Sequence, residues 1–306
     1  MAASSYILKS GVWKKVSDVN LYTGSAWKDV TQIYYWNGSA WVESFTKGFV
    51  FSKTLSGTTT NFNVATEATA QGWNGVDSVI ANITLATSAI VRSSSINSYA
   101  FDTVGLVANS TVNLTVGAAA YIVGLGGTGA MGSFSVVIPY PQTGYSNGAP
   151  GGPAMNILST INMSLTNNGT IGGGGGGGGG GNGGEANPTG WSFQGGSGGG
   201  GAGFGSGGPI TPGQPQANLS GPAGGAGTLT TGGAGVSTIG QHSSRGGLGG
   251  NGGNLGSTGN NGLNNASAGW SVYQSAGAGG PAGVAINGWS NITVVTQGSI
   301  LGAKNN

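Results

Sequence analysis

The chain has 306 residues, a formal net charge of +2, only 5% charged side chains and no cysteine, which excludes disulfides and thiolate metal sites. The charges form no basic run that would indicate a nucleic-acid or anionic-membrane partner. The N-terminus lacks the apolar core of a secretory signal, and no apolar stretch reaches the roughly 18 residues of a membrane span, so we expect a protein made in a cytoplasm that does not cross a membrane.

The first 47 residues contain a tryptophan repeat. Trp13, Trp27 and Trp41 lie at 14-residue intervals, and each is followed by a short strand-like run. The turn Gly-Ser-Ala precedes both Trp27 and Trp41. This pattern predicts a small β-meander whose aromatics form one contact row. So short a unit buries too little apolar surface to be stable alone, and we expect it to dock on a partner or self-associate. Tryptophans that serve as ordinary core residues remain an alternative, one that is compatible with docking.

Residues 48–120 alternate between apolar and polar side chains, as half-buried strands do. Val79, Ala81, Ile83 and Leu85 point one way, while Asn82 and Thr84 point the other. The same alternation recurs over residues 112–116 and 161–165. No convincing amphipathic helix occurs in the chain, so we expect an all-β fold here and essentially no α-helix anywhere.

Residues 121–306 hold 59 of the 68 glycines and only three charged side chains. Disordered segments are usually rich in charge, so the low charge and the interleaved aromatics predict packing. Glycine recurs every third residue from Gly247 to Gly262. That is the period of a polyproline-II-type helix, which has no internal hydrogen bonds and must bond to its neighbours.

The ten glycines Gly172 to Gly181 would span roughly 31 Å as the central rod of a polyglycine-II helix bundle, or sandwich. Collagen is the competing fold for a glycine-rich chain. It needs an unbroken Gly-X-Y register with abundant proline, and here the register breaks repeatedly and the chain has 10 prolines. We therefore expect three parts: a tryptophan-repeat meander over 1–47, a β-rich domain over 48–120 and a polyglycine-II domain over 121–306.

The chemistry of an enzyme is missing from the sequence. His242 is the only histidine, and the carboxylates Glu67, Asp77, Asp102 and Glu185 are isolated from one another. No Gly-Lys-Ser/Thr follows a glycine loop, and no zinc or EF-hand spacing occurs. We expect a non-enzymatic protein without a cofactor or a metal site.

Loops of different composition separate the glycine rods, and binding residues commonly lie on loops held by a rigid scaffold. Tyrosine and tryptophan on such loops provide large contact area at low entropic cost. An alternative role for these aromatics is to cap the rods, and we favour it for Phe204 and Trp289. The candidate binding residues are Trp191, Phe193, Gln214, His242, Trp270 and Tyr273.

Three passages together carry a family resemblance. They are Asn167 to Gly174, with the polyglycine run that follows, Gly280 to Thr293, and Gly298 to Gly302. Over residues 100–306 the chain resembles the glycine-rich tail-fibre and tail-tip proteins of bacteriophages. It is similar to the T-even-type fibre-tip adhesins, in which loops between polyglycine-II helices contact bacterial outer-membrane receptors.

The resemblance implies a receptor-binding protein of the virion tail, synthesised in the host cytoplasm. Its loops would bind an outer-membrane protein, a pilus or a glycan of the host. Its N-terminal part would attach to other tail proteins through Trp13, Trp27, Tyr35 and Trp41. The tryptophan repeat departs from those adhesins, so the attachment partner and the choice between monomer and homotrimer stay open. A purely structural tail cap or spacer is the alternative, and an ice-binding protein, which needs a flat regular face, is a third.

Overall fold

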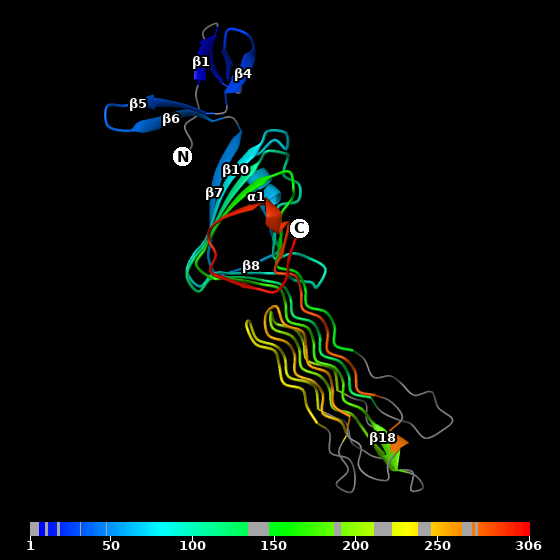
Figure 1. Ribbon diagram of the computed structural model, residues 1–306. Helices are drawn as coiled ribbons and strands as arrows, with labels where there is room; N and C mark the ends of the chain where they lie inside the picture. Colours follow the sequence, from blue (N-terminus) through cyan, green and yellow to red (C-terminus); the bar gives the residue numbers. More distant parts are fainter. Residues whose placement is uncertain are drawn as a thin grey trace.

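The computed structural model describes residues 6–306 except 10–11, 17–18, 31, 47, 134–146, 187–190, 211–221, 238–245, 265–270 and 273–274. Three parts follow one another along the molecule. Small hairpins lie at one end, a body of parallel strands lies in the middle, and long glycine-rich segments extend to the other end (Figure 1). Within the described residues, no helix is long and apolar enough to cross a membrane.

Each tryptophan of the repeat lies in the second strand of its own hairpin. The strands are β1 (Tyr6–Lys9) with β2 (Val12–Lys15), β3 (Val19–Tyr22) with β4 (Trp27–Val30), and β5 (Gln32–Trp36) with β6 (Trp41–Thr46). In the described residues these pairs are three separate antiparallel sheets rather than one meander. A single residue separates β4 from β5, and this is shorter than the two-residue loop that a tight hairpin between them would need.

The body consists of three five-stranded parallel sheets. The first contains β7 (Phe49–Leu55), β10 (Val79–Leu85), β13 (Thr111–Val116), β16 (Asn162–Asn167) and β22 (Ile292–Thr296). The second contains β8 (Thr58–Thr60), β11 (Ile90–Arg92), β14 (Tyr121–Val123), β17 (Thr170–Gly172) and β23 (Ser299–Leu301). The third contains β9 (Phe62–Asn63), β12 (Phe101–Asp102), β15 (Met155–Asn156), β21 (Ile286–Asn287) and β24 (Lys304–Asn305).

Successive strands of the body belong to the first, the second and the third sheet in rotation, and three such strands make one turn of a three-sided coil. Each strand lies beside its counterpart in the next turn. The predicted alternation is confirmed, because Val79, Ala81, Ile83 and Leu85 are all buried inside the coil. In the parallel register, Ile83 faces Leu114 and Leu114 faces Leu165. These apolar rows stack from turn to turn and form the main core of the molecule.

The expected all-β fold is confirmed, but the structure also contains one short helix that the sequence analysis did not predict. Helix α1 (Val64–Ala70) begins at Asn63, whose side-chain oxygen accepts a hydrogen bond from the Thr66 backbone N–H at 2.8 Å. A 3-10 helix, η2 (Trp289–Asn291), precedes β22. Two turns of α-helix are too short to show a periodic apolar pattern, so the cap at Asn63 was the available signal.

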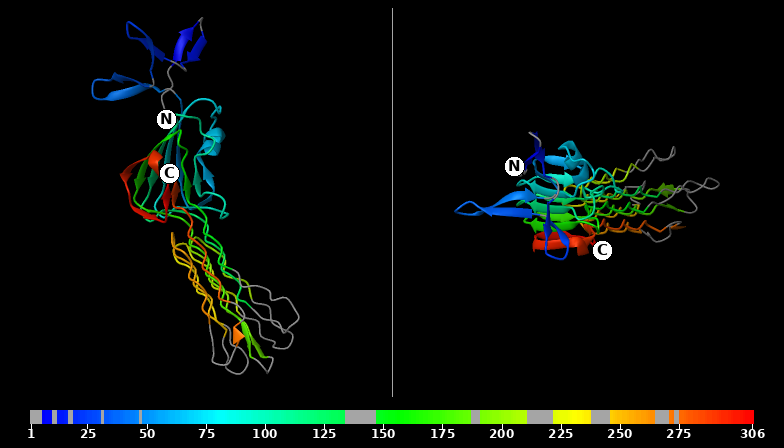
Figure 2. Two further views of the ribbon diagram at one scale, coloured as in Figure 1. Left: turned by 45° about the vertical axis from the view of Figure 1, so that its right-hand side comes forward. Right: turned by 90° about the horizontal axis from the view of Figure 1, so that it is seen from above.

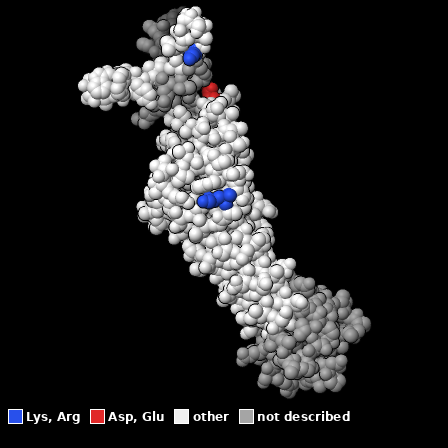
Figure 3. Space-filling model, viewed as in Figure 1, with Lys and Arg blue, Asp and Glu red and all other residues white. Residues whose placement is uncertain are grey.

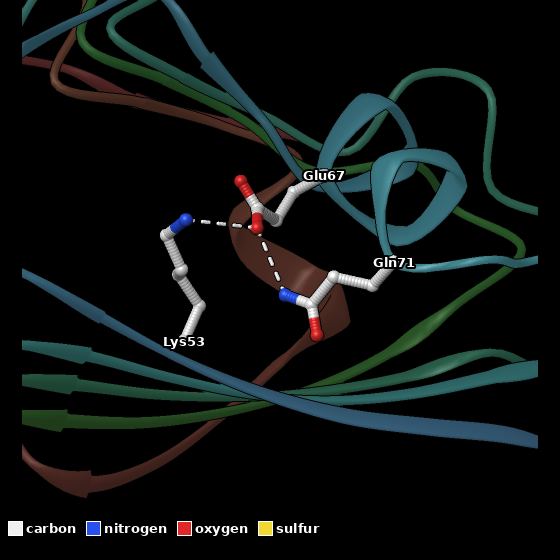
Figure 4. Close-up of polar contacts among 3 residues, drawn as sticks. All are labelled: Lys53, Glu67 and Gln71. Atoms are coloured by element: carbon white, nitrogen blue, oxygen red, sulfur yellow. Dashed lines mark hydrogen bonds and ion pairs between the residues drawn. The ribbon is translucent and has the colours of Figure 1, made fainter.

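A polar cluster joins α1 to β7 (Figure 4). Lys53 Nζ donates to Glu67 Oε1 at 2.9 Å, and Gln71 Nε2 donates to the same oxygen at 2.8 Å. Partial burial raises the pKa of Glu67, but the hydrogen bonds from Gln71 and Lys53 and the charge of Lys53 outweigh it and hold the pKa below its usual range.

This depressed pKa predicts an acid-dependent contribution to stability. The contribution is present above the unfolded-state pKa of about 4.3 and is lost as the pH falls through the lower folded-state pKa. It is small, because the Lys53 side chain is partly exposed and water screens the pair. Glu67→Gln should therefore lower the melting temperature at pH 7 but not well below pH 4. An equal decrease at both pH values would contradict the assignment.

The glycine-rich part arises where two turns of the coil are interrupted. Two segments leave the coil and return to its third sheet, and we call them the excursions. The first, residues 124–154, connects β14 to β15, and the second, residues 173–285, connects β17 to β21. The described segments of both excursions run side by side away from the coil (Figures 1 and 2). The three sheets therefore include strands from both the expected middle domain and the expected glycine-rich domain.

The ten-glycine segment lies at the centre of this part, and residues 171–183 are all buried. Its backbone N–H groups donate in rotation to three neighbouring segments, 149–152, 196–202 and 257–260. For example, the N–H groups of Gly175, Gly178 and Gly181 donate to every third carbonyl of one neighbour, those of Ala202, Gly199 and Gly196, at 3.0, 2.7 and 2.9 Å. Its carbonyls accept from three others, 124–133, 250–256 and 277–283. Six segments thus satisfy the backbone of the seventh.

Glycine is required throughout this segment for reasons of space. A Cβ built at any position from Gly173 to Gly181 would lie well inside van der Waals contact with a carbonyl oxygen of a neighbouring segment. The obstructing atoms are backbone atoms that are themselves hydrogen-bonded, so they cannot move aside as a flexible side chain would.

Candidate functional site

One end of the glycine-rich part, far from the coil, collects residues that are distant in sequence. We call it the distal end (Figure 1). There the Ser133 N–H donates to the Gly181 carbonyl at 3.0 Å, and the Gly195 N–H donates to the Ser133 carbonyl at 2.8 Å. The Ser133 hydroxyl accepts a hydrogen bond from the Gly183 N–H and donates to the Gly181 carbonyl. Ser133 is buried, so these bonds fix two excursions to each other at this end.

Further described residues join the same end. The Gly247 N–H donates to the Asn182 carbonyl at 2.9 Å, and the Val236 N–H donates to the Ser197 carbonyl at 3.0 Å. The Ser197 hydroxyl donates to the Pro209 carbonyl at 2.7 Å. Hydrogen bonds that include the buried residues Asn182 and Ser197 therefore hold several of the described segments together at this end.

A small antiparallel sheet, in the order β19-β18-β20, lies at the distal end. Its strands are β18 (Gly184–Ala186), β19 (Trp191–Phe193) and β20 (Ser271–Val272). The predicted binding residues Trp191 and Phe193 are in β19, and Trp191 pairs with Ala186. Trp270 and Tyr273 are the residues directly before and after β20 in sequence. They lie outside the described residues, as do Gln214 and His242.

Carboxylates in the described part are engaged with different neighbours. Asp77 Oδ2 accepts from the Asn74 side chain at 2.8 Å, and Asp102 Oδ1 accepts from the Asn156 side chain at 3.0 Å. Glu67 is bound to Lys53 and Gln71, as described above. No group of three His, Cys, Asp or Glu that could hold a metal ion occurs among the described residues. On the face drawn in Figure 3, the described residues carry few charged atoms.

The hairpins present a second candidate surface, at the end of the molecule opposite the distal end (Figures 1 and 2). Trp27 is 71% exposed, Trp41 69% and Tyr35 52%. Trp27 and Trp41 are therefore not core residues within this chain. Trp13 lies in β2, and its side chain lies outside the described part.

In the second and third hairpins, the expected single row of aromatics is replaced by a pair across the two strands. Tyr22 and Trp27 have ring centroids 5.1 Å apart, and Trp36 and Trp41 have centroids 5.7 Å apart. Tyr22 and Trp36 are missing from the sequence-based candidates. Their signal was available, because each precedes a repeat tryptophan by five residues, the spacing of a hairpin with a four-residue loop.

The two aromatics for which we favour a capping role both contact residues of the coil. Phe204 lies under Arg92 of β11, with the guanidinium carbon 5.4 Å from the ring centroid. Trp289 packs against the core of the coil, and Lys304 Nζ is 4.5 Å from its ring centroid. The Phe204 contact thus connects the second excursion to the coil, whereas Trp289 and Lys304 both belong to the coil.

A family model described as "Phage tail fibre adhesin Gp38" matches residues 50–305. The three hairpins precede the matched region. Among solved structures, the chain is similar to the gp37-gp38 adhesin tip complex of the bacteriophage S16 long tail fibre, with 22% identity and a TM-score of 0.46, over 85% of this chain and 83% of that chain. No curated protein matches the chain.

Proposed function

Since the chain belongs to the family of phage tail fibre adhesins and is a component of the virion tail, we propose that it binds a bacterial cell-surface receptor through the distal end of its glycine-rich part. The observation that carries the proposal is the gathering of the excursions at that end, where buried hydrogen bonds through Ser133 and Asn182 join their described residues. A rigid scaffold that holds several connecting segments side by side is suited to recognition.

We propose that the glycine-rich segments pack as polyglycine-II helices. Two observations support this. Hydrogen bonds from the central segment return to the same neighbour at every third residue, which is the period of this helix. Six segments surround the central one at distances that leave no room for a Cβ. Such a scaffold would be rigid, because each rod is bonded to several others.

The proposed receptor contacts are Trp191, Phe193, Gln214, His242, Trp270 and Tyr273. Support comes from β18, which pairs with both β19 and β20 and so joins the segments that carry four of them. These side chains are aromatic or polar, and they would dock by shape on an outer-membrane protein, a pilus or a glycan. Neither catalysis nor a cofactor is part of the proposal.

We propose that residues 1–47 attach the chain to the tail, that residues 48–120 form the β-rich body and that residues 121–306 bind the receptor. The last range also includes the later strands of the coil. Trp13, Trp27, Tyr35 and Trp41 would attach the chain to other tail proteins. Their support is the exposure of Trp27, Tyr35 and Trp41 at the end opposite β18 (Figure 2).

The chain carries few charges, so receptor binding should depend only weakly on salt. We expect adsorption to host cells to change little between low and moderate ionic strength, as measured by titrating labelled protein on cells. A steep loss of adsorption over this range would point instead to an electrostatic contact.

A structural tail cap or spacer, whose loops bind other tail proteins, is the competing function. Exchange of residues 187–190 and 265–270 for the corresponding residues of another member of the family separates the two functions. If the protein is an adhesin, the phage should assemble normally and change its host range. If the protein is a structural component, the exchange should reduce assembly of the tail.

A further inference from the structure

The outer face of the first sheet of the coil carries a row of threonines, one from each of its five strands. In the first four strands each threonine precedes a buried residue, so by alternation its own side chain points away from the core. The parallel register brings the five side by side, and in strand order they are Thr54, Thr84, Thr115, Thr166 and Thr296. The first, second and fifth are exposed, and the other two are half-buried.

A second polar row runs beside the threonine row, nearer the start of each strand. Its members in strand order are Ser52, Asn82, Asn113, Ser164 and Thr293. Within this row, Asn113 Nδ2 donates to Asn82 Oδ1 at 2.9 Å. The two rows therefore consist of hydroxyl and amide side chains and contain no charge. We call them together the threonine face.

The threonine face is a regular array. Neighbouring strands of a sheet are about 4.8 Å apart and alternate residues of one strand about 6.6 Å apart, and these distances set the spacing along and between the rows. Over five strands the threonine row is therefore about 19 Å long. One step along a row is close to the length of one sugar unit in an extended polysaccharide.

Stacked polar side chains in the third sheet provide a contrast. There Asn287 Nδ2 donates to Asn156 Oδ1 at 2.8 Å, and Asn156 Nδ2 donates to Asp102 Oδ1 at 3.0 Å. These groups satisfy one another and so hold adjacent turns of the coil in register. The threonines of the outer row make no side-chain hydrogen bond to any described residue. Their hydroxyls are therefore available to an external ligand.

We infer that the threonine face binds a neutral polysaccharide of the bacterial surface, whose extended chain lies along the two rows. Hydroxyl and amide groups both donate and accept hydrogen bonds, as the hydroxyls of sugars do. The absence of charge from both rows suits an uncharged ligand. A protein partner would need an apolar centre to bury, and the two rows provide none.

Ice is another ligand with a regular array of hydrogen-bonding groups. A flat ice surface requires side chains of equal length, whereas the second row mixes serine, asparagine and threonine. This uneven row suits a sugar chain, whose hydroxyls lie at different heights.

The threonine face is separate from the distal end, because Figure 1 shows β7 and β10 far from β18. The inference rests on the proposed adhesin function, which would bring the side of the coil into the polysaccharide layer of the host. Hydrogen bonds exposed to water are individually weak. A contact made of them would support receptor binding by keeping the chain close to the cell.

The experiment uses the full-length chain and lipid-free polysaccharide released from the surface of an infected strain, separated into neutral and anionic fractions by ion exchange. Thr84→Val with Thr115→Val removes two central hydroxyls and keeps the β-branched shape that strands favour. Thr58→Val with Thr60→Val is the matched control, because both threonines are exposed on β8 of the second sheet. Melting temperatures check that each variant is folded.

We expect the neutral fraction to bind the parent, and the first variant to raise the Kd about 10-fold or more, because two hydrogen bonds are lost. The control variant should bind as the parent does. Affinity should increase with the length of polysaccharide fragments until they span the strands of the face, and then level off.

Unchanged Kd in Thr84→Val with Thr115→Val, binding confined to the anionic fraction, or no polysaccharide binding would overturn the inference. Thermal hysteresis of the parent without polysaccharide binding would overturn it in favour of ice.

The variant Trp270→Ala with Tyr273→Ala separates the threonine face from the distal end. It should keep polysaccharide binding while it loses saturable binding to cells. Loss of polysaccharide binding in this variant would place that ligand at the distal end, which overturns the inference and leaves the proposed function intact. Equal binding of this variant and the parent to cells would count against the proposed receptor contacts and not against the threonine face.

Discussion

Gly177→Ala should prevent the glycine-rich part from folding. Gly177 lies in the central segment, where its N–H donates to the Ala149 carbonyl at 2.9 Å and its carbonyl accepts from the Gly280 N–H at 2.8 Å. A methyl group there would collide with the Thr128 carbonyl oxygen and the backbone of Gly129. Relief of the collision requires two hydrogen-bonded segments to separate, so we expect a loss of about 4 kcal/mol or more in the free energy of unfolding.

The matched control is Gly225→Ala. Gly225 also bonds to neighbouring segments, but the nearest backbone atoms to its Cβ would be those of Ala234 at 3.1 and 3.2 Å, which need to shift by only a few tenths of an ångström. Thermal unfolding and soluble yield of both variants measure the difference. Equal melting temperatures for Gly177→Ala and the parent would show that the central segment is not packed as described.

The joint change Trp270→Ala and Tyr273→Ala should abolish binding to host cells. Truncation of an aromatic at the centre of an interface typically costs 2 kcal/mol or more. Two such losses would raise the Kd roughly 1,000-fold. The measurement is a titration of labelled protein on whole cells, with circular dichroism to check the fold.

Val76→Ala provides the control for this change, because Val76 is exposed and lies in the segment between α1 and β10, two elements that Figure 1 shows far from β18. It should bind as the parent does. If the joint variant also binds as the parent does, the receptor contacts lie on other segments, and Trp191 and Phe193 of β19 become the next pair to test.

Local patterns predicted the strands of the coil well. The alternation of β10, β13 and β16 depends on a period of two residues, which is visible in any short window, and burial of Ile83, Leu114 and Leu165 confirms it. The three-sided arrangement could not be predicted in the same way. It depends on parallel pairing between strands of successive turns, which can be far apart in sequence. In one turn of the coil, for example, more than a hundred residues separate β17 from the next strand, β21.

The glycine run was correctly expected to lie at the centre of its neighbours, because a segment with no side chains can be approached from every direction. The candidate site was harder to define. Trp191 and Phe193 are placed in β19, while Tyr22 and Trp36 emerged only when the hairpin register put them opposite Trp27 and Trp41. Helix α1 was not predicted, because the helix that follows its cap at Asn63 has too few residues to show a periodic apolar pattern.

The most direct test of receptor binding by this tail fibre adhesin is to measure binding of the purified, labelled chain to a panel of bacterial strains that the parent phage does or does not infect. We expect saturable binding to the strains that are infected and none to strains that resist adsorption. Absence of binding to every infected strain would contradict the proposed function and favour a structural role in the tail.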